Sequence, residues 1–144
     1  MRCKLLNNGN QKTWALILDS GDNVMKCITE FAQKKDLSTS QFTAIGAFSE
    51  ALLAFFNFET KDYNHLPVYE QTEVLAFNGN ITLTEDNDIQ IHAHAVLGKS
   101  DGSTTGGHVL SATVHPTLEI IITESPVYLK RHHDHETGLQ LLKF

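Results

Sequence analysis

The sequence contains little cysteine. Its 144 residues include only Cys3 and Cys27, which form neither a CxxC pair nor a closely spaced disulfide framework. A disulfide-stapled scaffold is therefore excluded, and we expect both thiols to be small buried side chains in a reducing compartment. A domain of this length buries roughly 70% of its unfolded surface, so its core needs no covalent staple.

Long hydrophobic runs are also missing. The longest apolar run, residues 51–56, is far shorter than the roughly 20 residues that cross a bilayer as a helix. Residues 1–6 are followed by polar Asn7 before a signal-peptide hydrophobic region could form. These features predict a cytoplasmic protein with no membrane span. Because repeats and linkers are absent as well, residues 1–144 are expected to form a single domain.

Positive charge is scarce. The 11 Lys and Arg residues are outnumbered by 17 Asp and Glu residues, which gives a formal net charge of −6. Phosphate contacts supply most non-specific affinity for nucleic acids, so we expect this chain alone to bind DNA weakly at best. The adjacent pairs Lys34-Lys35 and Lys130-Arg131 are expected to be solvated surface residues.

Motifs for nucleotide binding and covalent catalysis are absent. Residues 98–102 resemble a phosphate-binding loop, but no helix is expected after them, as such a loop requires. No serine lies in a nucleophile-elbow pattern, and neither cysteine has a local catalytic signature. Both chemistries are therefore set aside.

One helix is expected near the start of the chain. A strand over residues 13–18 ends at Asp19-Ser20-Gly21, and Asp22 can then cap a helix that ends near residues 34–36. Its apolar residues recur at helical spacing, at Val24, Ile28 and Phe31.

The rest of the chain has the pattern of β-strands. Residues 42–48 and 51–58 are predicted to form one hairpin, and residues 73–77 and 80–83 a second around a tight Asn78-Gly79 turn. Further strands are expected over residues 89–97, 108–113, 118–123, 127–130 and 139–144, with a glycine-rich loop over residues 98–107. One early helix followed by antiparallel strands predicts an α+β fold, a mostly antiparallel sheet with one packed N-terminal helix.

Three histidines form the most informative pattern. His92 and His94 are two residues apart on one strand, so they point to the same face, and His108 follows Gly106-Gly107 on the next strand. If these strands pair, the three imidazoles can bind a divalent ion, most favourably zinc, or else nickel, cobalt or iron. Three protein ligands would leave a position open for water or a small anionic ligand. Alternatively, these histidines are polar residues that only make hydrogen bonds.

Other polar residues have weaker claims. The run of residues 132–135 contains His132, His133, Asp134 and His135, but adjacent residues of an extended segment point apart, so we expect a solvated hairpin tip. His65 and His115 lie beside loop signals and receive no role. Glu73 and Glu119 are candidates for a general base beside the metal, although strand alternation alone places neither.

Several segments, in their order and spacing, resemble the plants and prokaryotes conserved (PPC) domain, a family with a predicted DNA-binding role. The resemblance covers essentially the whole chain and rests on residues 44–48, 73–81, 91–94, 106–110, 118–122 and 136–139.

The resemblance implies a homotrimer with a DNA-associated or regulatory role, since plant relatives join this domain to AT-hooks. This chain has no Arg-Gly-Arg-Pro hook. The plant form also lacks the histidines yet keeps the fold, which implies that the histidines serve something other than folding. The alternative to a regulatory trimer is a metal-dependent small-molecule binding protein, or a hydrolase or lyase that uses the open metal position. Whether the chain is an enzyme stays open at this point.

Overall fold

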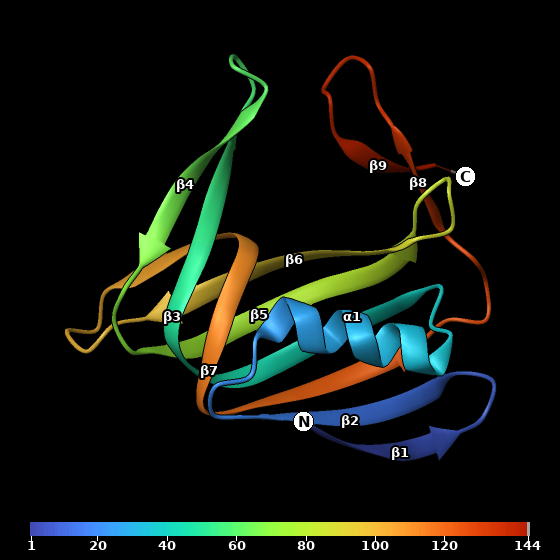
Figure 1. The fold of residues 1–144 in the computed structure, drawn as a ribbon, viewed down its shortest axis with the longest axis horizontal. Helices are drawn as coiled ribbons and strands as arrows, with labels where there is room; N and C mark the ends of the chain where they lie inside the picture. Colours follow the sequence, from blue (N-terminus) through green and yellow to red (C-terminus); the bar gives the residue numbers. More distant parts are fainter. Residues whose placement is uncertain (144) are drawn as a thin grey trace.

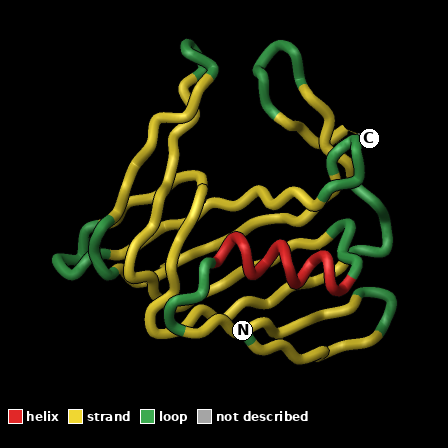
Figure 2. Tube along the Cα trace, in the orientation of Figure 1, coloured by secondary structure: helices red, strands yellow, loops and turns green. Residues whose placement is uncertain are grey.

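Nine β-strands and one α-helix make up residues 1–143, which are the residues described by the structure, a computed structural model (Figures 1 and 2). In chain order the elements are β1 (Arg2–Asn8), β2 (Lys12–Asp19), α1 (Val24–Lys35), β3 (Ser40–Asn57), β4 (Asp62–Val68), β5 (Thr72–Leu83), β6 (Ile89–Gly98), β7 (Thr104–Glu124), β8 (Lys130–His133) and β9 (Gln140–Lys143).

The strands form one sheet that partly closes on itself. Its main order is β1-β2-β7-β3-β5-β8-β9, while β4 pairs with β3, and β6 pairs with both β5 and β7. Four of the strands therefore form a closed ring of pairings, which are β3–β5, β5–β6, β6–β7 and β7–β3. All pairings are antiparallel except one parallel bridge between β5 and β8. The predicted α+β class, with a mostly antiparallel sheet and one helix in a single compact domain, is confirmed.

Helix α1 lies across the sheet and buries one face (Figure 1). Val24, Ile28 and Phe31 are buried, as their spacing predicted. The expected cap at Asp22 is wrong by one residue, because the side chain of Asn23 accepts the hydrogen bond from the Lys26 N–H at 3.0 Å. The carboxylate of Asp22 instead accepts from the backbone N–H of Asp19.

Strand β3 replaces the hairpin predicted from residues 42–48 and 51–58. Ser49-Glu50 supplies no residue with a positive φ angle, so the chain continues instead of turning back. Pairing between β3 and β7 shifts register at three places between Gly46 and Leu53, and both strands change direction there (Figure 1). Gly46 has a φ angle of 150°, and a Cβ atom there would lie 2.2 Å from the Thr117 carbonyl oxygen, so only glycine fits.

The second predicted hairpin is also wrong, because Asn78-Gly79 lies inside β5. Gly79 pairs with Phe42 of β3 on one side and with Ala93 of β6 on the other. A Cβ atom at Gly79 would lie 2.5 Å from the Phe42 ring and 2.7 Å from the His92 carbonyl oxygen. This glycine therefore allows close packing and does not make a turn.

Strand β7 merges two predicted strands with the last four residues of a predicted loop. The loop between β6 and β7 is only residues 99–103, and Gly106 and Gly107 already belong to the strand. His115, which the sequence places beside a loop signal at Pro116, lies with that proline within β7. His65, also expected beside a loop, lies in β4. At the C-terminus, strands β8 and β9 begin later than the predicted segments at residues 127 and 139, and Phe144 lies outside the described residues.

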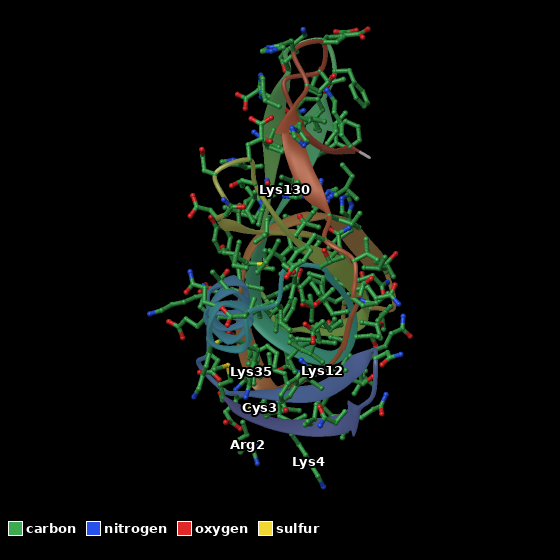
Figure 3. The ribbon with its side chains drawn as sticks, turned by 90° about the vertical axis from the view of Figure 1, so that its right-hand side faces the viewer. Arg2, Cys3, Lys4, Lys12, Lys35 and Lys130 are labelled. Atoms are coloured by element: carbon green, nitrogen blue, oxygen red, sulfur yellow. The ribbon has the colours of Figure 1, made fainter. Side chains whose placement is uncertain are left out.

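The two cysteines differ in environment. Cys27 lies on the buried face of α1, as expected, but Cys3 is exposed, because all of β1 lies at an uncovered edge of the sheet. Figure 3 shows Cys3 at this end of the molecule, near Arg2 and Lys4. No helix among residues 1–143 is long and apolar enough to cross a membrane.

Candidate metal centre

The three predicted histidines come together where β6 pairs with β7. His94 lies directly opposite His108 in the register of these strands, and His92 is two residues further along β6. The possible ligand atoms of the three residues all lie within 4.8 Å of one another. His92 Nε2 and His94 Nε2 are 3.1 Å apart.

The double glycine before His108 lets these backbones approach closely. A Cβ atom at Gly106 would lie 2.7 Å from the Ala95 carbonyl oxygen of β6, and one at Gly107 would lie 2.6 Å from the Ala54 carbonyl oxygen of β3. Side chains at these positions would push β7 away from its two neighbours. The sequence reasoning that linked this pair of glycines to the placement of His108 is therefore physically sound.

The histidines fit a divalent ion in chemistry and spacing. Burial, and then the charge of Arg131, lowers the pKa of His92 to about 4; burial, followed by His94 and Arg131, also lowers the pKa of His108. Both rings are therefore held in the neutral form that binds metals. Tetrahedral zinc with bonds of about 2.0–2.1 Å separates its nitrogens by about 3.3 Å, close to the observed 3.1 Å. His108 Nδ1 is buried and accepts or donates no hydrogen bond among the described residues.

Arg131 is a site residue that the sequence reasoning missed. It was expected to be a solvated surface residue, yet it is 4% exposed. Its guanidinium donates to Thr82 Oγ1 at 3.0 Å, to Asn80 Oδ1 at 2.8 Å and to the Gln140 carbonyl oxygen at 2.8 Å. Its Nη2 also lies 3.3 Å from His92 Nδ1. No spacing in the sequence marks this arginine, because a lysine–arginine pair is normally exposed.

Tyr63 of β4 is a second residue that was missed. Its ring stacks on His108, with centroids 5.1 Å apart and planes 29° from parallel. Tyr63 reaches His108 through the order of the strands. It pairs with Phe56 of β3, and β3 lies between β4 and β7. The sequence alone does not give this order, so it could not predict the contact.

Two cavities border the histidines. One of about 310 Å³ lies between His92, His108 and Arg131, and the turn and strand of the C-terminal hairpin form its other wall. The second, of about 530 Å³, borders His92 and His94 together with Ser40, whose buried hydroxyl has no hydrogen-bond partner among the described residues. Small molecules can therefore reach the histidines from either side.

The two candidate general bases are not at this site. Glu73 and Glu119 line a separate cavity beside Ile45, and neither lines a cavity that borders the three histidines. A general base from these two carboxylates is therefore excluded in this chain.

The second histidine run does not form a metal site. His132 and His133 belong to β8, so only part of this run is the expected hairpin tip, which residues 134–139 form. His132 Nδ1 lies 2.5 Å from Glu85 Oε1, and the rings of His133 and His135 are 5.0 Å apart. Within residues 1–143, only His92, His94 and His108 form a group of three or more possible metal ligands.

Comparison with known proteins finds one matching family and several similar solved structures. The family model of the Plants and Prokaryotes Conserved domain, abbreviated PCC or PPC, matches residues 6–126. A crystal structure of a metal-containing protein from Archaeoglobus fulgidus is 32% identical, with a TM-score of 0.85 over 92% of this chain and 94% of that one.

Two further solved structures are described as candidate DNA-binding proteins. The one from Bacteroides thetaiotaomicron is 27% identical, with a TM-score of 0.88 over 99% of this chain and 97% of that one. The one from Ralstonia eutropha is 30% identical, with a TM-score of 0.84 over 91% of this chain and 90% of that one. Curated protein sequences gave no match.

Proposed function

Because the chain belongs to the Plants and Prokaryotes Conserved domain family, we propose that it is a metal-binding member of that family, with His92, His94 and His108 as ligands. The observation that carries the proposal is the convergence of these imidazoles, two of which are held neutral by burial. The metal-containing relative from Archaeoglobus fulgidus supports it.

Zinc is the proposed ion. Three histidine nitrogens and an open position are the ligand set of several zinc sites, and a bound ion would supply Lewis acidity at that position. The chain's own residues prepare the site. Tyr63 packs against the His108 ring and limits its rotation, while the buried charge of Arg131 favours the neutral form of His92.

The proposed assembly is a homotrimer. Besides the family resemblance, large apolar side chains on the β3–β4 arm support it, since Phe55 and Phe58 are 62% and 74% exposed and Leu66 is 37% exposed. Such side chains are commonly covered by another subunit. Light scattering after size-exclusion chromatography tests this: we expect three times the 16.0 kDa chain mass, and a stable monomer would overturn the trimer.

A DNA-associated or regulatory role is the second proposal, supported by the descriptions of two relatives. Arg2, Lys4, Lys12 and Lys35 lie toward the β1 end of the molecule (Figure 3), but Arg2 pairs with Asp19 at 2.7 Å and Lys12 with a glutamate at 3.5 Å. We therefore expect weak direct binding. If duplex DNA binds no more tightly than the roughly 10⁻⁴–10⁻⁶ M non-specific range at physiological salt, direct binding by this chain is excluded.

Metal-dependent binding of a small molecule is the alternative that the cavities favour. Glu73 and Glu119 lie elsewhere and supply no general base to this site. Glu124, however, lines the larger cavity beside His92 and His94, so a hydrolase or lyase reaction stays the other form of this alternative. The proposed setting is the cytoplasm, where a reducing environment suits the free thiols of Cys3 and Cys27.

Elemental analysis tests the metal proposal directly. Protein purified without a nickel column or chelator should carry about one divalent ion per chain. His94→Ala should lose most of this metal, whereas the matched variant His135→Ala, which changes an exposed histidine outside the group, should keep it. Wild-type protein that contains no metal and cannot be reloaded with zinc, cobalt or nickel would overturn the proposal.

A further inference from the structure

Arg131 is a buried cation without an acidic partner. The ion pairs found among residues 1–143 do not include it, although it is 4% exposed. Its hydrogen bonds go to a hydroxyl, an amide oxygen and a backbone carbonyl, all of which are neutral. A buried charge is normally neutralised by an opposite charge, because desolvation otherwise makes it costly. The counter-charge is therefore expected from outside the described chain.

The contact between Arg131 and His92 points to the same missing partner. His92 Nε2 is the nitrogen that lies 3.1 Å from His94 Nε2, so metal binding through Nε2 leaves the ring proton on Nδ1. That N–H would then face Arg131 Nη2, another donor, at 3.3 Å. Metal-binding histidines almost always donate this second N–H to an acceptor. An anionic oxygen that lies beside this contact, within hydrogen-bond distance of both nitrogens, would accept from both.

The adjoining cavity has room and lining for an organic anion. Its volume is about 310 Å³, and it borders His92, His108 and Arg131. The remaining wall is partly apolar, formed by Ile91, Leu139 and Leu141 together with Tyr63.

We infer that this cavity binds a small organic carboxylate, with its charged end at Arg131 and His92 and its apolar end against the C-terminal hairpin. Arg131 is thus a ligand-recognition residue and not only a structural one. The inference rests on the proposed metal site, because the metal fixes the proton on His92 Nδ1. It names the class of molecule that would occupy the open side of that site.

Calorimetric titration of the zinc-loaded wild type tests the inference without any substitution. Sodium propionate should bind at one site per chain, and propionamide, which has the same size but no charge, should bind at least roughly tenfold more weakly. Inorganic phosphate is the third probe, since it has the charge but no apolar end. Equal binding of propionate and propionamide, or tighter binding of phosphate than of propionate, would overturn the carboxylate assignment.

Two variants test whether Arg131 is the residue that binds propionate. Arg131→Gln should lose propionate binding while keeping about one metal ion per chain, whereas Lys130→Gln removes the same charge one residue earlier and should leave binding unchanged. Lys130 donates to Asn87 and lines neither cavity beside the histidines. Should Arg131→Gln fail to fold, the wild-type comparison of propionate with propionamide still decides the question.

The metal content of each sample separates the two proposals. Wild-type protein that holds metal but does not respond to propionate overturns the carboxylate inference and leaves the metal site intact. Wild-type protein that takes up no metal overturns the proposed function. Titration of that metal-free protein then shows whether Arg131 binds the carboxylate by itself, and an absence of binding overturns the inference as well.

Discussion

The helix-covered core and the histidine end of the sheet are built in opposite ways. Between α1 and the sheet, side chains such as Leu18, Ile28 and Phe31 are at most 1% exposed and are entirely apolar. At the other end, His92 and His108 are half-buried, and the Nδ1 atom of His108 has no hydrogen-bond partner among the described residues. Buried polar groups without partners cost stability, so this end is not arranged for stability alone.

The difference teaches that folding and ligand binding are separated in this domain. The two regions share long strands, since β7 begins beside the histidines and ends under α1. Substitutions in the core should therefore change stability and leave the metal affinity of the folded chain intact, whereas substitutions in the histidine group should do the reverse. Each prediction below compares these two outcomes.

The largest expected effect on stability is in the core. Phe31 packs edge-on against Trp14, with ring centroids 5.7 Å apart, so Phe31→Ala removes a large buried side chain and leaves a cavity. We expect the free energy of unfolding to fall by about 3–5 kcal/mol in urea denaturation of the metal-free protein. The matched variant Phe31→Leu should cost less. Loss of metal from the folded fraction of Phe31→Ala would contradict the separation of the two regions.

Acid should weaken the histidine end first. The pKa of His92 falls to about 4 on folding and that of His108 also falls, so the unfolded chain binds more protons below its ordinary histidine pKa of about 6.5. The contribution of these two rings to the free energy of unfolding is therefore fully present above pH 6.5, and it is lost as the pH falls toward 4. Because these rings are half-exposed, we expect a loss of only about 1–2 kcal/mol.

Urea denaturation of metal-free protein at a series of pH values measures this loss. His92→Gln should flatten the pH dependence, since the largest shift belongs to that ring. A pH dependence that is unchanged in His92→Gln would show that other groups are responsible.

A smaller effect is expected at the start of α1. Asn23→Ala removes the side-chain acceptor of the Lys26 N–H, and loss of a helix cap typically costs about 1 kcal/mol. Asn23→Asp, which keeps an acceptor, should be close to wild type. The measurement is again urea denaturation, and equal stability of Asn23→Ala and Asn23→Asp would rule out the capping role.

The sequence predicted the parts of the fold that depend on periodicity. The α1 face and the shared face of His92 and His94 follow from spacing along one element, and both were predicted. The breaks placed at Ser49-Glu50 and Asn78-Gly79 were wrong, because they depend on contacts between strands. Gly79 is a turn signal in isolation, but in the sheet it makes room for the Phe42 ring.

Only the histidines of the candidate site could be predicted from the sequence, for the same reason. The histidines share a simple spacing, whereas Arg131 and Tyr63 reach them through β5–β8 and β3–β4 pairing across the sheet. Their burial and stacking depend on that pairing. In the sequence, neither the Lys130-Arg131 pair nor the single tyrosine at residue 63 gives any sign of that pairing.

The smallest expected change in stability comes from His94→Ala in the metal-free chain. His94 is exposed, and among residues 1–143 its side chain makes only the 3.1 Å contact with His92, so its removal leaves no cavity and no new buried group without a partner. We expect the free energy of unfolding to stay within about 0.5 kcal/mol of wild type. Saturating zinc should then stabilise the wild type and not the variant, because a ligand stabilises only the state that binds it. Comparable stabilisation of both proteins by zinc would mean that the ion binds elsewhere. The proposed separation between a ligand-binding histidine end and a stabilising core would then be wrong.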